Sequence, residues 1–275
     1  MKKDETGKII RMEEYQSIQQ EIAELRSQLE EMILMRQRLI YDDGKNVEMD
    51  YMQQIGHLEY QLLQYQYQAI RARRQAELLQ RNFGRTAEID QEKIERQLDS
   101  EFREHRVRLA QWEAALSRAE KRSKQKELSE EETEELYDAY RQILTRLHPE
   151  LNPNALGNSA DILRQTAEFL VRRDLDSMRR AAQMTMEIAK ENQENLKGSQ
   201  LKQRKSQLRE SVENVRREIE RAEKSFPYNQ RALLKNPNAV RAMQRELRGQ
   251  MSYYKEMCDI YAQRLREYGE QGARS

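Results

Sequence analysis

Apolar residues recur along this chain at alternating steps of three and four positions, in four long stretches. The first two stretches cover 15–39 and 47–79, and the last two cover 201–222 and 240–268. Heptad spacing of this kind places apolar side chains along one seam of an α-helix and is typical of coiled coils. We therefore predict four long helices, each with one face that another helix must cover.

Short polar segments separate these helices in pairs. Residues 42–46 supply a turn between the first two stretches, and residues 225–229 force a reversal between the last two. Two helices joined by so short a connection usually pack as antiparallel neighbours. The pattern therefore predicts an N-terminal antiparallel hairpin over 1–85, with a further break at 82–86, and a C-terminal antiparallel hairpin over 193–275.

The part between the hairpins, 86–192, is also helical in pattern, with a long helix expected to about residue 127. Ser129 and Glu132 have the spacing of a capping box, so a new helix begins after Ser129. That helix must stop at His148, because the residue before a proline avoids the α conformation. Further N-caps are expected at Asn158 or Ser159, at Asp174, and at Asn236, which precedes Pro237.

The composition supports an elongated all-α protein. The 275 residues include only 9 glycines and 4 prolines, while 35% are charged and 37% are hydrophobic. Formal net charge is +1, from 49 basic and 48 acidic residues, which argues against a general polyanion binder. No stretch approaches the length of apolar sequence that a membrane span needs, and Cys258 has no partner for a disulfide within the chain. We expect a cytoplasmic protein without a membrane segment.

Residues that carry chemistry are sparse, and the sequence predicts no enzyme, no catalytic residue, no metal site and no cofactor. His57, His105 and His148 are far apart and lack ligands at metal-binding spacing, and no phosphate-binding glycine loop is present. One basic and aromatic stripe could bind single-stranded nucleic acid, although a solvated helix end explains it better. Its members are Arg71, Arg73, Arg74, Arg81 and Arg85, near Tyr60, Tyr65 and Tyr67.

The most informative stretch is 139–153, Ala-Tyr-Arg-Gln-Ile-Leu-Thr-Arg-Leu-His-Pro-Glu-Leu-Asn-Pro. It resembles the second helix and following loop of a J-domain, the module by which Hsp40-type co-chaperones engage Hsp70. That family has His-Pro-Asp in the loop, whereas Glu150 here moves the carboxylate one methylene further from the backbone. The looser resemblance covers 129–174, called the J-like segment below.

The resemblance implies a docking surface for Hsp70 made by Arg141, Arg146, His148, Pro149 and Glu150. Both arginines would stay solvated, and His148 would pack and hydrogen-bond at the helix end. Pro149 would set the turn, and Glu150 would present an acid to a basic partner. In the family, loss of the loop Asp usually abolishes stimulation of the Hsp70 ATPase, so the exchange to Glu implies weakened or lost stimulation.

The helix before the loop has an apolar face whose residues should form the core of this segment: Tyr140, Leu144 and Leu147. The family's first helix is missing, and residues 112–116 are expected to take its packing role. No Gly/Phe linker or zinc-binding cysteine repeats follow. With the break at 226–229, the layout also resembles uncharacterised J-domain-like coiled-coil proteins of Gram-positive bacteria.

These features predict a non-enzymatic protein–protein interaction protein, a co-chaperone or adaptor for which Hsp70 is a candidate partner. The alternative is a structural coiled-coil scaffold in which the J-like segment joins the hairpins together. Nucleic-acid binding is the weaker third possibility. The seams could pair within one chain or between chains, and a homodimer through the hairpins is reasonable, because an isolated two-helix arm buries little surface.

Overall fold

The computed structural model describes residues 2–3, 9–10, 12–82, 91–153, 155, 157–188 and 198–272. Within these ranges the chain is helical, which confirms the all-α class. The exception is an antiparallel pairing of two short strands, β1 (Lys2–Lys3) and β2 (Ile9–Ile10). The chain forms two compact units, one from 1–47 and 124–229 and the other from 48–123 and 230–275. No helix among the described residues is long and apolar enough to cross a membrane.

The chain does not turn back at 42–46, so the predicted connection of the N-terminal hairpin is wrong. The helical path runs through α1 (Met12–Arg38), the π-helical turn η1 (Leu39–Asp43), α2 (Gly44–Tyr51), the π-helical turn η2 (Met52–Gly56) and α3 (His57–Asn82). Asp42 lies in η1 and is only 3% exposed. The polar residues that suggested a solvated turn are therefore part of a helix. The break expected at 82–86 lies outside the described residues, apart from Asn82.

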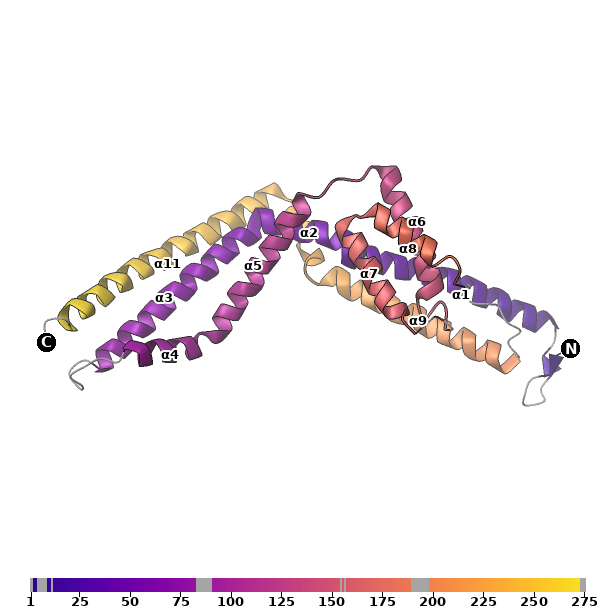
Figure 1. Ribbon diagram of the computed structural model, residues 1–275, viewed down its shortest axis with the longest axis horizontal. Helices are drawn as coiled ribbons and strands as arrows, with labels where there is room; N and C mark the ends of the chain where they lie inside the picture. Colours follow the sequence, from indigo (N-terminus) through magenta and orange to yellow (C-terminus); the bar gives the residue numbers. More distant parts are fainter. Residues whose placement is uncertain are drawn as a thin grey trace. The chain divides into compact units, whose positions relative to one another are not determined.

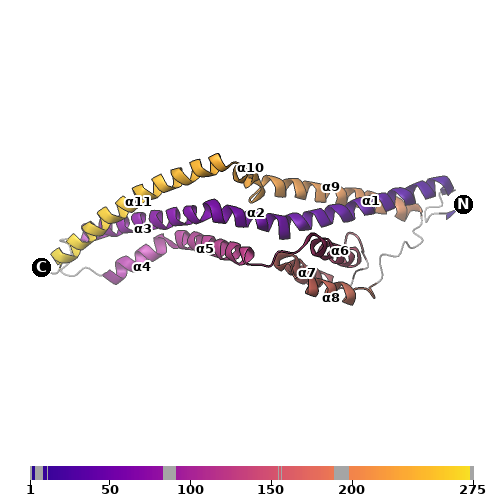
Figure 2. The ribbon, with the colours of Figure 1, turned by 90° about the horizontal axis from the view of Figure 1, so that it is seen from above.

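In the first unit, α1 packs against α9 (Gly198–Lys224), and the two helices lie side by side in both views (Figures 1 and 2). Ion pairs join them at rising residue numbers: Glu14–Lys202, Glu21–Arg209 and Arg36–Glu218. The helices are therefore parallel, which no short connection can produce. Their apolar seams are buried in this contact, as Ile18, Leu29, Leu208 and Val212 illustrate.

In the second unit, α3 packs in parallel against α11 (Pro237–Gly272). Gln244 donates to the carbonyl of Gln54 at 2.7 Å, and the Cys258 thiol lies 3.6 Å from the carbonyl of Tyr65. The predicted C-terminal hairpin is therefore also corrected: α9 and α11 each have a partner from the N-terminal part of the chain. The heptad pattern located the buried faces but could not say which helix covers them.

The helices α4 (Gln91–Glu101) and α5 (Arg103–Ser123) run antiparallel to α3. The rings of Tyr67 and Phe102 meet edge to face with centroids 5.9 Å apart. Trp112 and Leu116 pack against a buried cluster that includes Met52. The residues expected to replace the first J-domain helix are therefore part of this second core, and the expected division at residues 85 and 192 is not the one observed.

The end signals at Ser129, His148, Asp174 and Asn236 were predicted correctly, whereas the expected capping bond of Asn158 is not formed. In the first unit, α6 (Glu130–Leu147) begins with the capping box of Ser129 and Glu132 and ends before His148. Asn158 precedes α7 (Ser159–Arg172) without a capping side-chain bond, and Asp174 caps α8 (Leu175–Met184) through the amide of Ser177. After η3 (Tyr228–Gln230) and α10 (Arg231–Leu234), Asn236 accepts from the amides at the start of α11.

The junction between η1 and Tyr228 explains why residue 44 is glycine. The carbonyl of Leu39 accepts the amide of Gly44, five residues on, and also the hydroxyl of Tyr228 at 3.0 Å. A Cβ atom at Gly44 would clash with that carbonyl and would lie 3.3 Å from the Tyr228 ring. The π-helical turn and the tyrosine together leave no space for a side chain.

We predict that Gly44→Ala lowers the free energy of unfolding by about 1–3 kcal/mol, because the clash forces the π-helical turn or Tyr228 to move. The control is Gly249→Ala in α11, where a Cβ atom would meet no atom within 4 Å. That change should stabilise the protein by about 0.5–1 kcal/mol, since alanine favours helix over glycine. Urea unfolding followed by circular dichroism measures both, and equal effects would contradict the packing at Gly44.

Candidate functional site

The helices α6, α7 and α8 pack on one another within the first unit and are called the α6–α8 unit here. Tyr140, Leu144 and Leu147 are all almost fully buried. The interior of α6 also includes Leu136 and Ile143. Beyond its own helices, the unit contacts α1 through α6 and η1 through α7. The J-like segment is thus covered by the N-terminal helical path.

The two arginines of the expected docking surface differ. Arg141 is exposed, as predicted. Arg146 is only 9% exposed, and its guanidinium donates to the carbonyl of Gln142 at 2.9 Å, so the prediction that it stays solvated is wrong. The carbonyl of Arg146 accepts from the side-chain amide of Asn152 at 2.8 Å, which closes the following loop onto the end of α6.

The His-Pro-Glu loop lies against the rest of its own unit. His148 is 8% exposed, and its Nε2 atom lies 3.5 Å from Nη2 of Arg36 on α1. The carbonyl of His148 accepts the amides of Leu151 and Asn152, which forms a tight turn, while Pro149 stays exposed. Burial, together with the nearby charge of Arg36, lowers the pKa of His148 to about 4. The imidazole is therefore neutral at pH 7.

The loop also contacts α9. Arg204 donates to the carbonyl of Glu150 at 3.0 Å, and Glu218 pairs with Arg36 at 2.5 Å. The Oε2 atom of Glu150 is buried and has no hydrogen-bond partner. The resemblance implied that this carboxylate is presented to a basic partner. In the structure one of its two oxygens is buried. Helices α1 and α9 therefore both contact the His-Pro-Glu loop.

A second polar contact fixes the α6–α8 unit to η1. The buried carboxylate of Asp42 accepts the hydroxyl of Tyr137 and, at 3.2 Å, the Nε atom of Arg173. The guanidinium of Arg38 lies 4.2 Å from the centre of the Tyr137 ring. Arg173 reaches Asp42 from a left-handed backbone conformation, with φ of 52°, at the end of α7. Burial and then the bond to Asp42 raise the pKa of Tyr137 well above its usual value.

This contact was missed from the sequence. The sequence predicts that Asp42 lies in a turn, and no local pattern links it to Tyr137 or Arg173, which lie 95 and 131 residues away. The helical spacing of apolar residues in α6 predicts that Tyr137 is buried, since it lies on the same face as Tyr140 and Leu144. Its partner could not be found in this way.

The basic stripe on α3 is largely neutralised by acids of the same unit. Arg71 pairs with Glu95 at 2.5 Å, and Arg74 pairs with Glu101 at 2.8 Å. The hydrogen bond from Arg74, with a further one from Gln97, lowers the pKa of Glu101 to about 2. Arg73 pairs with Glu77, and Arg85 lies outside the described residues. Paired arginines offer little free charge to a phosphate backbone.

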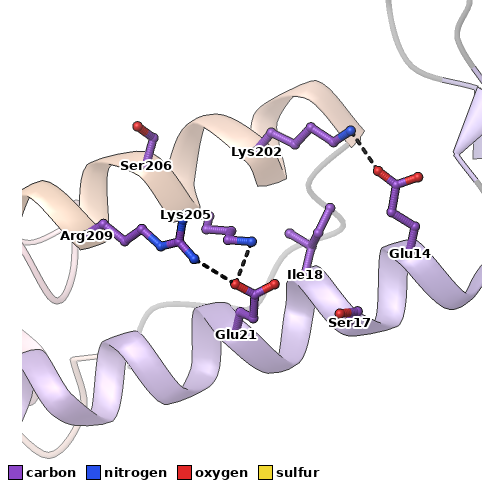
Figure 3. Close-up of a pocket in the computed structure, with 8 residues that line it drawn as sticks. All are labelled: Glu14, Ser17, Ile18, Glu21, Lys202, Lys205, Ser206 and Arg209. Carbon is purple, nitrogen blue, oxygen red and sulfur yellow. Dashed lines mark hydrogen bonds and ion pairs between the residues drawn. The ribbon is translucent and has the colours of Figure 1, made fainter.

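A groove of about 430 Å³ lies between α1 and α9 (Figure 3). Charged side chains cross it: Lys205 and Arg209 both reach Glu21, at 2.5 and 3.0 Å, and Lys202 reaches Glu14 at 2.8 Å. The bond from Lys205 lowers the pKa of Glu21. Each of these bases is paired with a carboxylate of the facing helix, so the groove is part of the helix–helix contact.

We predict that lowering the pH reduces the stability of the first unit through protonation of His148. The folded-state pKa of about 4 lies below the ordinary value, so the folded protein binds fewer protons and loses stability as pH falls from 6.5 towards 4. Between pH 7 and 5 this contribution is about 2 kcal/mol. Urea unfolding at both pH values should show a smaller pH dependence in His148→Gln than in the wild type. An unchanged dependence would place His148 in solvent.

We predict that Asp42→Asn lowers the free energy of unfolding by about 2 kcal/mol, because Arg173 loses its buried counter-charge. The matched control is Asp138→Asn, an exposed residue on α6 next to Tyr137. Its effect should stay within about 0.5 kcal/mol, as for most surface substitutions. Denaturation of both variants in parallel measures the difference, and a silent Asp42→Asn would contradict the proposed importance of this carboxylate.

No family model matches the chain, and neither a curated protein nor a solved structure matches it. The likeness of 129–174 to a J-domain therefore rests on the motif in the sequence. What the chain can do must be argued from the geometry around His148 and Glu150.

Proposed function

We propose that this chain is a non-enzymatic protein–protein interaction protein, a J-like adaptor whose His-Pro-Glu loop binds its own helices in place of an external chaperone. The observation that carries the proposal is the burial of His148 against Arg36. A loop in this state cannot stimulate an Hsp70 without first leaving α1 and α9. Hsp70 is thus a partner only of a form in which the loop is free.

The charges around the loop support this assignment. Docking on an external partner would require the carboxylate of Glu150 to face outwards, yet one of its oxygens is buried, and Arg204 holds the backbone of the same residue. A charge-paired contact depends strongly on geometry, so the extra methylene of Glu150 weakens it further. Both features reduce chaperone stimulation, and they are independent of each other.

A structural scaffold is the second candidate, and one observation favours it. The loop contacts α1 through His148 and α9 through Glu150, so it bridges two helices that lie far apart in the sequence. In that case the J-like segment stabilises the parallel helix pair and has no chaperone role. The two candidates differ in whether a released loop acts on Hsp70.

We predict that the wild-type chain does not stimulate the single-turnover ATPase rate of the Hsp70 from the same host. Glu150→Asp should also be silent, because shortening the acid does not release His148. A co-chaperone with an intact His-Pro-Asp loop serves as the positive control.

Stimulation by the wild type that disappears in His148→Gln would contradict the proposal, since it would show that the loop is available as the chain stands. Stimulation by Glu150→Asp alone would show that the length of the acid, and not burial of the loop, prevents activity.

A further inference from the structure

We infer that Arg36 and Glu218 form a latch that holds the His-Pro-Glu loop against α1 and α9. This inference rests on the proposed function, in which the loop is occupied within the chain. The guanidinium of Arg36 faces two groups at once: Nη1 lies 2.5 Å from Glu218, and Nη2 lies 3.5 Å from His148. The ion pair with Glu218 therefore helps to position the guanidinium against which His148 lies.

The two sides of the latch differ in their access to solvent. The Arg36 side chain is 15% exposed, whereas that of Glu218 is 51% exposed. A competing cation or a basic partner can thus reach Glu218 from outside, while His148 stays inside. An arginine without its carboxylate would then share a small space with a neutral imidazole. Both would gain hydration if the loop moved away.

Glu150 supplies a second and independent reason why this loop can open. Its buried Oε2 atom has no hydrogen-bond partner in the closed form. A buried polar atom without a partner is costly, and water would satisfy it once the loop leaves. Hydration of Glu150 on opening therefore offsets part of the free energy that is lost with the loop's contacts at Arg36 and Arg204.

The contact at Asp42 would hold the unit in place while the loop is released. Asp42 binds Tyr137, near the middle of α6, and Arg173, at the end of α7. Neither group belongs to the loop. Loss of the Arg36–Glu218 pair should free residues 148–150, while fully buried Leu151 and Asn152, which donates to the carbonyl of Arg146, stay in place. The α6–α8 unit would stay attached through η1. The latch thus regulates the loop and does not hold the fold together.

Hydrogen exchange of the full chain at pH 7, followed by mass spectrometry, tests the latch. Glu218→Gln keeps the size of the side chain and removes its charge. It should accelerate exchange of peptides that cover 148–153 by about two- to fivefold, while peptides of α1 and α9 stay as in the wild type. The matched control is Glu14→Gln, which weakens the Glu14–Lys202 pair between the same two helices and changes neither Arg36 nor Arg204 (Figure 3).

The latch is overturned if Glu218→Gln leaves the loop peptides unchanged, or if α1, α9 and the loop accelerate together, because the variant then loosens the whole unit. The double variant Glu218→Gln with Glu150→Asp separates this from the proposed function. Faster loop exchange together with Hsp70 stimulation supports both proposals. Faster loop exchange without stimulation supports the latch and overturns the chaperone partner, leaving the scaffold.

Discussion

The first unit depends on Asp42, because its buried carboxylate requires a counter-charge and hydrogen-bond donors. Moving an ionised group out of water costs several kcal/mol unless donors surround it. Tyr137 and Arg173 meet this need from α6 and from the end of α7, so both helices are brought to η1. The end of α6 lies about three turns beyond Tyr137. This geometry places the loop that follows it at Arg36 and Glu218.

Features that depend on neighbouring residues were predictable from the sequence. The capping box at Ser129, the cap at Asp174 and the stop at His148 each involve groups within four residues of one another. The apolar seams were also located correctly, because the helical period alone decides which side chains share a face. The pairing of the helices was not predictable. A seam does not encode the direction of its partner, and short polar segments favoured antiparallel neighbours where the structure has parallel ones.

Some features of the candidate site could likewise be predicted from the sequence, and others could not. Its motif identified His148, Pro149 and Glu150, and the spacing in α6 identified the buried face that includes Tyr140. The environment of the loop could not be predicted, since Arg36 lies 112 residues before His148 and no local pattern connects them. A short motif can specify the shape of a loop, but distant residues decide whether that loop is presented or covered.

The His-Pro-Glu loop is held by helices of its own chain. A titration of the His148 imidazole by NMR in the wild-type protein tests it most directly, because the ring itself reports its surroundings. We predict a pKa near 4 for this imidazole, owing to burial and to the charge of Arg36. A pKa near 6.5, the value of a solvated histidine, would contradict it and would show a loop that is open to a partner.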